Sequence, residues 1–238
     1  MSKILDAMQD DPGRRPDHAD YQLGTMNEAQ LFPPPPENLL LQLDHIAGSL
    51  ISRRQSGKGL PLVFTAASSG EGVSFVSYSV ARHLAYLLDG NVAWIDANYM
   101  SPQPRLAGSQ PSFRSLLKDP ESARQLQAGS GLTVVGHGDE EIKLTELLTC
   151  GNYERLLANL SERFFFTVFD GPPVIASMET AHMARYAEGA VLVVQAQRLK
   201  YEVVRHGLER LRSQGGDILG TILNRRSFQI PGFLYRRL

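Results

Sequence analysis

The stretch LPLVFTAASSGEGVSFVSYSVARHLAYLL, residues 60–88, decides the fold class of this chain. It opens with an apolar run at 60–67, which is too short for a helix and is bounded by glycine, as buried parallel strands are. A turn with Gly70 and Gly72 follows, and residues 74–88 have the apolar spacing of a helix. A strand, a glycine-rich turn and a helix in this order are typical of a loop that binds phosphate through backbone N–H groups.

The alternation of strand and helix continues on the C-terminal side of this stretch. We expect further strands at 91–96, 131–136, 164–170, 189–195 and 217–224, and helices at 112–119, 145–164, 176–188 and 200–215. Such alternation predicts an α/β fold, with a doubly wound, mostly parallel sheet and helices on both faces. Ligands of these sheets bind at the carboxyl ends of the strands, which is where the glycine-rich turn lies.

The N-terminal part of the chain differs in composition from the rest. Residues 1–36 are largely polar and end in the proline run 33–36, so we expect a flexible tail. Residues 37–54 carry apolar side chains at helical spacing and predict a helix that packs on the main domain. The predicted organisation is therefore a proline-rich tail at 1–36, a phosphate-loop domain at 37–224 and a C-terminal tail at 225–238.

Composition excludes several classes of protein. The 238 residues include 24 Lys and Arg and 25 Asp and Glu, a formal net charge of -1 that gives no support for nucleic-acid binding. The single cysteine, Cys150, allows no intramolecular disulfide, which fits a reducing compartment. No apolar run reaches the roughly 18 residues that span a membrane, and the N-terminus lacks the apolar core of a signal peptide. We expect an intracellular protein.

The turn resembles the P-loop pattern G-x-x-x-x-G-K-[ST] but lacks its lysine. The pattern places a lysine at position 73, where this chain has Val73, whereas Ser74 keeps the hydroxyl that ligates Mg²⁺. The predicted nucleotide contacts are Ser69, Gly70, Glu71, Gly72, Val73, Ser74, Phe75 and Asn224. Many strand-to-helix turns are rich in glycine without binding a ligand, so the turn alone leaves both interpretations open.

Two predicted strands end in a carboxylate. Asp96 ends the strand at 91–96, and Asp170 ends the strand at 164–170 before Pro172 and Pro173. In P-loop proteins such aspartates hold Mg²⁺ directly or through water, so Asp96 and Asp170 are the candidate catalytic residues and, with Ser74, the candidate metal ligands. The alternative is that each aspartate only caps a helix or forms a turn.

Taken together, these segments resemble the cytoplasmic tyrosine autokinases of bacterial capsule and exopolysaccharide export, of the CpsD/CapB and Wzc kinase type, which are relatives of the ParA/MinD ATPases. The resemblance runs from about Glu37 to Asn224. It rests on six ordered matches: ASSGEGVS at 67–74, WIDAN at 94–98, KLTELLTCGNYERLL at 143–157, FFTVFDGPPV at 165–174, AVLVVQAQRLKYEVV at 190–204 and GTILN at 220–224.

The departures from the family pattern concern catalysis. Val73 replaces the lysine, Asn98 replaces the second aspartate of D-x-D, and Met100 stands where the family often has arginine. The tail lacks the family's tyrosine cluster, because Tyr235 is the only tyrosine after Tyr201. A lost charge contact in a phosphoryl-transfer transition state commonly costs about 3 kcal/mol or more. The departures therefore favour a non-catalytic protein.

Other cations could replace the missing lysine. Lys58 precedes the strand at 60–67 and lies at its wrong end, whereas Lys200 follows the fifth strand with nothing in the spacing to aim it at the loop. A partner subunit could also donate a lysine or arginine. Two alternatives stay open for the cofactor: Mg-ATP or Mg-ADP, or no nucleotide.

The C-terminal tail combines basic and aromatic residues. Its candidate contacts with a partner or a membrane are Arg225, Arg226, Phe233, Tyr235, Arg236 and Arg237. This mixture suits an anionic membrane surface or an acidic groove on a partner. The alternative is a tail that folds back on its own domain.

The resemblance and its departures lead to three hypotheses. The first is a non-catalytic P-loop subunit that regulates or scaffolds a bacterial exopolysaccharide synthesis and export complex, cytoplasmic and peripheral at the inner membrane. Its partner would be the membrane co-polymerase, also called the chain-length protein, or another subunit of the synthase complex, and a homo-oligomer is a further alternative. The second is an active ATP-dependent tyrosine autokinase of the same system. The third is a ParA/MinD-like positioning ATPase.

Overall fold

The structure is a computed structural model that describes residues 31–54, 58–129, 131–139 and 151–225. Its helices are α2 (Glu37–Arg53), α3 (Val73–Leu87), α4 (Phe113–Lys118), α6 (Asn152–Arg163), α7 (Met178–Tyr186) and α8 (Tyr201–Ser213), with short 3-10 helices η2 (Pro104–Leu106) and η3 (Pro120–Gln125). Its strands are β1 (Leu60–Ala66), β2 (Val92–Asp96), β3 (Leu132–Val135), β4 (Phe166–Asp170), β5 (Gly189–Gln195) and β6 (Ile218–Asn224).

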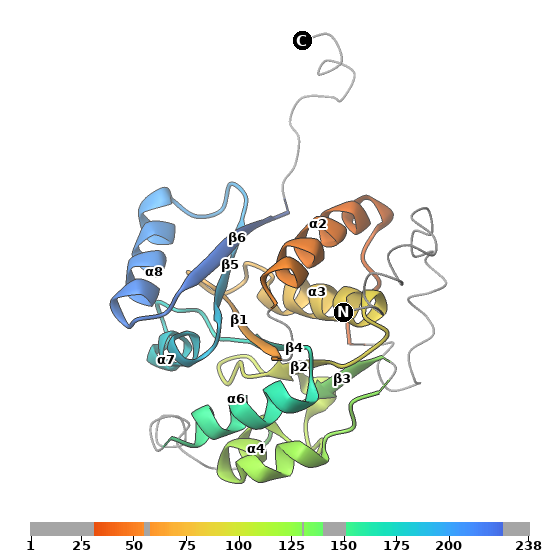
Figure 1. The fold of residues 1–238 in the computed structure, drawn as a ribbon. Helices are drawn as coiled ribbons and strands as arrows, with labels where there is room; N and C mark the ends of the chain where they lie inside the picture. Colours follow the sequence, from red (N-terminus) through yellow and green to blue (C-terminus); the bar gives the residue numbers. More distant parts are fainter. Residues whose placement is uncertain (1–30, 55–57, 130, 140–150, 226–238) are drawn as a thin grey trace.

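The strands form one six-stranded sheet in the order β3-β2-β4-β1-β5-β6 (Figure 1). Every pairing in it is parallel. Parallel neighbours need crossover connections, and the helices between the strands supply them. The predicted α/β fold is confirmed.

Two of the differences between the predicted and the observed element boundaries concern β4 and α6. The strand expected at 164–170 begins at Phe166, because Phe164 and Phe165 still belong to the turn after α6. The helix expected at 145–164 is described only from Asn152, after Gly151 with a φ of 80°. The rest of that prediction, with Cys150, lies outside the described residues.

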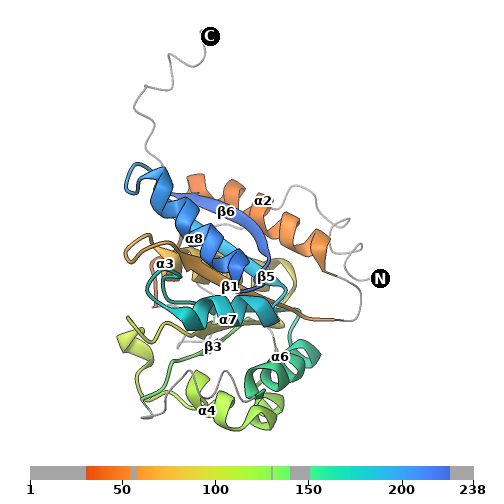
Figure 2. The ribbon, with the colours of Figure 1, turned by 90° about the vertical axis from the view of Figure 1, so that its left-hand side faces the viewer.

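The apolar strands are buried on both faces because helices cover both sides of the sheet (Figures 1 and 2). In β1, Leu62 and Phe64 face the cluster that contains α2 and α3. Val63, between them, faces the cluster that contains α4 and α6. This alternation follows from the two-residue period of a strand, and it explains why the strand sequences read as continuous apolar runs.

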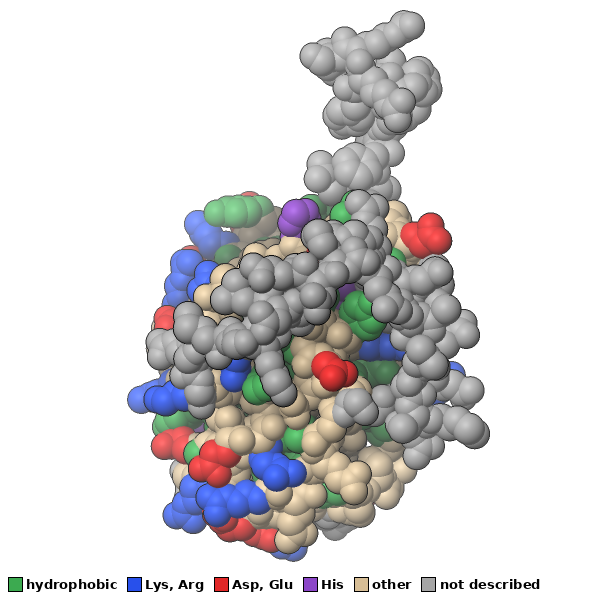
Figure 3. Space-filling view, turned by 45° about the vertical axis from the view of Figure 1, so that its right-hand side comes forward, with side chains coloured by type: hydrophobic (Ala, Val, Ile, Leu, Met, Phe, Trp, Pro, Cys, Tyr) green, Lys and Arg blue, Asp and Glu red, His purple; other side chains and the backbone are tan. Residues whose placement is uncertain are grey.

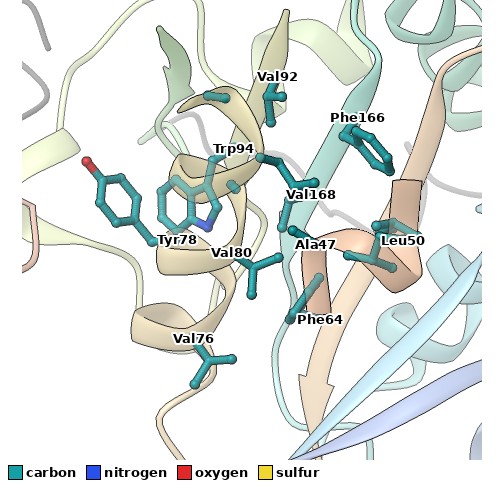
Figure 4. Close-up of a cluster of buried hydrophobic side chains, with 14 of the residues drawn as sticks. Ala47, Leu50, Phe64, Val76, Tyr78, Val80, Val92, Trp94, Phe166 and Val168 are labelled. Atoms are coloured by element: carbon teal, nitrogen blue, oxygen red, sulfur yellow. The ribbon is translucent and has the colours of Figure 1, made fainter. Parts of the chain in front are cut away.

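The cluster under α2 and α3 is built around Trp94 and Tyr78 (Figure 4). Their ring centroids lie 5.6 Å apart in an edge-to-face arrangement, and the indole N–H of Trp94 donates to the Ser77 hydroxyl at 3.0 Å. Both rings are almost fully buried. Trp94 is therefore a core residue whose indole N–H has a hydrogen-bond partner.

The packed part of the chain begins before residue 37. Leu31 is buried in the same cluster, and the Phe32 ring lies 5.4 Å from Tyr78 and 6.1 Å from Phe75. These contacts attach the end of the predicted tail to the α2–α3 layer. Residues 1–30 lie outside the described part, so a flexible tail there stays a prediction.

The sheet order brings the polar strand ends together. Asp96 at the end of β2 pairs in register with Asp170 at the end of β4, which in turn pairs with Phe64 of β1. On the other side of β1, Ala66 pairs with Val193 of β5. The loop after β1 therefore lies between the two aspartates and the segment after β5.

Candidate functional site

The loop after β1 has the backbone shape that its glycines predict. Gly70 and Gly72 have φ angles of 82° and 87°, in the left-handed region that residues other than glycine rarely adopt. Gly72 is the N-cap of α3 and supplies no side-chain cap. The first N–H groups of a helix lack partners inside the helix, so the start of α3 at Val73 presents free donors to an anion.

Two neighbouring strands brace this loop. The fully buried Glu71 carboxylate accepts a hydrogen bond from the Gln195 N–H of β5 at 2.6 Å and one from the Ser68 hydroxyl at 3.4 Å. The Asn224 side-chain amide of β6 donates to the Glu71 carbonyl at 2.8 Å. Glu71 and Asn224 therefore hold the loop in shape, and their predicted contact with a nucleotide stays a prediction.

Asp96 is a buried carboxylate that already has two backbone partners. Its Oδ1 accepts from the Asn98 N–H at 3.0 Å, and its Oδ2 accepts from the Gln103 N–H at 2.7 Å. Burial raises the pKa of Asp96 to about 6, although the two hydrogen bonds oppose the rise. The carboxylate holds the segment between β2 and η2 in place.

Asp170 differs from Asp96 in its hydrogen bonds. It is fully buried, and neither of its carboxylate oxygens has a hydrogen-bond partner among the described residues. Burial raises its pKa well above the usual value; the nearby Ser74 hydroxyl opposes the rise, and the charge of Asp96 adds to it. Ser74 lies near enough to lower the pKa of Asp170, but its hydroxyl is outside regular hydrogen-bond geometry. Both carboxylate oxygens of Asp170 are therefore buried without a partner, and burial favours a proton or a cation on them.

The chemistry of this corner fits Mg²⁺. Asp170, Asp96 and the Ser74 hydroxyl offer the oxygen donors that this hard cation prefers, and the Asn98 side-chain oxygen is also buried without a partner. The described ranges contain no group of three or more His, Cys, Asp and Glu side chains placed to hold a metal. Mg²⁺ commonly binds one or two carboxylates and completes its shell with water and phosphate oxygens.

Position 73 contributes an apolar side chain. Val73 is partly buried and packs against the α2–α3 cluster, and so does Phe75, whose ring contacts Phe32. Of the two lysines considered from the sequence, Lys58 precedes β1 at the opposite edge of the sheet. Lys200 is exposed at the N-cap of α8.

The sequence analysis missed Arg198. Its guanidinium lies 2.8 to 3.2 Å from the point where a Cβ on Gly70 would stand. Knowledge of the strand order would have predicted its position, because β5 lies beside β1 and the residues that follow β5 lie next to the loop. A single sequence does not reveal which strands are neighbours.

The predicted partner and membrane contacts fall almost wholly outside the described residues, with Arg225 as the exception. Arg225 is exposed, has a φ of 52°, and donates to the Gln195 side-chain oxygen at 3.4 Å. The other members, Arg226, Phe233, Tyr235, Arg236 and Arg237, lie beyond the described range. Every helix within that range is too short or too polar to cross a bilayer.

Figure 3 shows one face of the molecule, partly covered by residues that are not described. In the visible part, Lys and Arg side chains lie interspersed with Asp and Glu along the lower left edge. This face therefore shows mixed charge, and the exclusion of nucleic-acid binding stays a prediction from composition.

Comparison with curated proteins finds tyrosine-protein kinases. CpsD of Streptococcus agalactiae serotype Ia is 27% identical over 179 residues, which cover 72% of this chain and 77% of CpsD. The tyrosine-protein kinase ptk of Acinetobacter johnsonii is 28% identical over 160 residues, which cover 64% of this chain. The chain spans only 22% of the length of ptk. No protein-family model matches the chain.

Solved structures agree with these relatives. The VpsO kinase domain is 27% identical with a TM-score of 0.63, over 80% of this chain and 98% of that domain. The chimeric protein CapA2B2 has a TM-score of 0.67 at 19% identity, over 86% of this chain and 92% of the chimera, and shows the fold alone. The same holds for cobyrinic acid a,c-diamide synthase of Mycobacterium smegmatis with bound ADP and magnesium, which has a TM-score of 0.56 at 18% identity over 69% of this chain and 74% of the synthase. The chain is therefore a homologue of the bacterial tyrosine-protein kinases and has the P-loop fold of their kinase domains.

Proposed function

We propose that this protein is a non-catalytic member of a bacterial exopolysaccharide synthesis and export system, in which it binds a magnesium nucleotide and regulates or scaffolds the complex. The observation that carries the proposal is the contrast at the loop. The glycine turn, Ser74 and the two buried aspartates lie at one corner of the sheet, which supports a phosphate and metal site there, whereas position 73 carries an apolar side chain that packs against the core.

The loss of the lysine affects catalysis more than binding. Phosphoryl transfer by P-loop proteins depends on positioning and on charge that stabilises the transition state. Val73 supplies neither a donor nor a charge, and removing such a contact commonly costs about 3 kcal/mol or more, a rate loss of about a hundredfold. Backbone N–H groups, Ser74 and a cation on Asp170 do not depend on that lysine.

The proposed ligand is a nucleotide together with its Mg²⁺ ion. When bound, Mg²⁺ would neutralise negative charge on the phosphate oxygens of a nucleoside di- or triphosphate. Ser74, Asp96 and Asp170 are the residues that would hold it, directly or through water. The loop N–H groups of residues 69–75 would orient the phosphates, and Asn224 would keep the loop in its bound shape through Glu71.

The partner and the location follow from the family resemblance. We propose that the protein works on the cytoplasmic side of the inner membrane, bound to the membrane co-polymerase through its basic and aromatic C-terminal tail, alone or as a homo-oligomer. The relatives are tyrosine-protein kinases, as the resemblance to the autokinases of capsule and exopolysaccharide export implies. This agreement supports a role in a polysaccharide system.

The first experiment measures phosphoryl transfer. The purified full chain is incubated with Mg-ATP, and phosphate release and phosphotyrosine are followed beside the Asp96→Ala variant and CpsD as a positive control. We expect the chain to stay at the level of its Asp96→Ala variant. Phosphotyrosine formed by the wild type and abolished in Asp96→Ala would instead establish an active autokinase.

The second experiment restores the missing lysine. Val73→Lys should raise the affinity for Mg-ATP by about 1 to 3 kcal/mol, the usual value of a charge-assisted hydrogen bond, as measured by isothermal titration calorimetry. Turnover should recover less than affinity, because Asn98 and Met100 still depart from the family pattern. If neither form binds Mg-ATP or Mg-ADP, the nucleotide part of the proposal is wrong.

A further inference from the structure

Arg198 reaches the phosphate loop from a different strand. It lies in the turn between β5 and α8, three residues after Gln195, whose N–H holds the Glu71 carboxylate. The terminal guanidinium nitrogens lie 2.8 and 2.9 Å from the point where a Cβ on Gly70 would stand. The absence of a side chain at Gly70 therefore leaves the space that the guanidinium occupies.

No group in the described structure neutralises this cation. The Arg198 side chain is exposed and takes part in no hydrogen bond or ion pair among the described residues. Other arginines pair within their own helices, such as Arg124 with Glu121 at 3.1 Å. Glu71, the residue after Gly70, accepts hydrogen bonds from Gln195 and Ser68. An unpaired guanidinium beside a phosphate loop is available for an anion.

The rest of the corner independently indicates a phosphate ligand. The carboxylate of Asp170 is fully buried with both oxygens unpartnered, which leaves both of them available to a cation. A cation held by one or two carboxylates completes its shell with phosphate oxygens. The uncapped start of α3 offers N–H donors on the same loop. The P-loop pattern also has a positive charge from its lysine, and Val73 does not provide one.

We propose that Arg198 supplies this charge, as a phosphate-binding residue for the nucleoside di- or triphosphate in the loop. The inference rests on the proposed nucleotide site and adds its cationic residue. A guanidinium can donate two parallel hydrogen bonds to one phosphate, which a lysine cannot. The cation thus comes from the turn after β5, and the first turn of α3 is free to pack into the core.

The test measures nucleotide affinity in charge-deletion variants. Calorimetric titrations with Mg-ADP and Mg-ATP are made on the full-length wild type, Arg198→Ala and Arg198→Lys. Lys200→Ala removes a cation two residues away, and Arg212→Ala removes an exposed one in the last turn of α8. We expect Arg198→Ala to weaken binding about tenfold to a hundredfold, Arg198→Lys to weaken it less, and both controls to bind as the wild type does.

A rescue experiment separates charge from local structure. In the Arg198→Ala background, Val73→Lys should restore affinity, because it returns a cation to the loop from the other side. Unfolding midpoints should stay within error of the wild type, since the Arg198 side chain has no partner among the described residues. A lower midpoint without loss of affinity would show a structural role and overturn the inference.

The two proposals fail in different ways. If the wild type binds nucleotide and Arg198→Ala binds equally well, the nucleotide site stands and the role of Arg198 is wrong. If Lys200→Ala weakens binding as much as Arg198→Ala, the effect is one of general charge, and the specific assignment is wrong. If the wild type binds neither nucleotide, the proposed function fails, and so does Arg198 as a replacement for the lysine.

Discussion

The carboxyl ends of β2 and β4 look alike in sequence and differ in the folded protein. Each is an apolar strand that ends in aspartate, and Asp96 and Asp170 are partners in register. Asp96 accepts hydrogen bonds from two backbone N–H groups that follow it in the chain. Asp170 is buried with both oxygens unpartnered.

The difference assigns different roles to two identical residues. The chain after Asp96 turns back and places the N–H groups of Asn98 and Gln103 on the carboxylate, so that Asp96 supports the fold. The chain after Asp170 continues through Gly171, Pro172 and Pro173, and prolines have no N–H to donate. Asp170 therefore has both oxygens left for a ligand, whereas each oxygen of Asp96 already accepts one backbone hydrogen bond.

The largest effect should come from Asp170→Asn. The variant should lose at least about a hundredfold in Mg-nucleotide affinity, because a neutral amide replaces the carboxylate that holds the cation. Without metal or nucleotide it should be more stable than the wild type by roughly 1 to 3 kcal/mol, because the wild type must either bury an unpaired charge at Asp170 or take up a proton there when it folds. Calorimetric titration and urea unfolding measure the two quantities.

Asp217→Asn is the matched control, since Asp217 is exposed and precedes β6 on the opposite edge of the sheet. Affinity and stability that are both unchanged in Asp170→Asn would contradict the assignment of this carboxylate to a cation.

The second effect is a pH dependence of the free energy of unfolding that comes from Asp96. Its folded pKa of about 6 lies above the ordinary aspartate value of 3.8, so between these pH values the folded protein keeps a proton that the unfolded chain has released. The free energy of unfolding should therefore fall as pH rises from about 4 to 6, by about 3 kcal/mol at roughly 1.4 kcal/mol per pKa unit. Urea unfolding at several pH values measures it.

The quantity to plot is the difference between the wild type and Asp96→Asn, in which the contributions of groups that do not interact with Asp96 cancel. One of these is His83, whose pKa is lowered by burial and which changes stability with pH in the opposite direction. A difference that stays flat from pH 4 to 7 would show that Asp96 is not desolvated in solution.

The smallest effect is local and tests the two backbone hydrogen bonds. In Asp96→Ala the amide protons of Asn98 and Gln103 should exchange with solvent about tenfold faster, since a hydrogen bond to a charged group contributes about 1.5 kcal/mol or more. Asp170→Ala should leave both amides unchanged. Hydrogen exchange followed by NMR measures them, and equal effects of the two variants would remove the distinction between the strand ends.

The sequence predicted the parts of the site that depend on local pattern. Alternating apolar runs and helical periods located all six strands, and the glycines of the loop adopt the positive φ angles that the P-loop pattern requires. The apolar burial of Trp94 was also predictable from its place in a strand. These features depend on residues close to one another in the chain, so a single sequence contains them.

The sequence did not predict features that depend on strand neighbours. The contact of the Phe75 ring with Phe32, from a segment assigned to the tail, was not predicted. Neither was the hydrogen bond that the Glu71 carboxylate accepts from the N–H of Gln195, which is 124 residues away in the chain. Such contacts follow from which strands pair and in what register, and periodicity does not specify this.

By itself, the sequence determined an α/β chain with a phosphate loop, two aspartates at strand ends and no lysine at position 73. Only the tertiary structure decided that Asp96 is occupied by backbone N–H groups while Asp170 has none, and that Arg198 comes to lie against Gly70. The physical reason is that strand-forming and loop-forming tendencies are local, whereas burial and charge at a strand end depend on distant segments placed there by the order of the sheet.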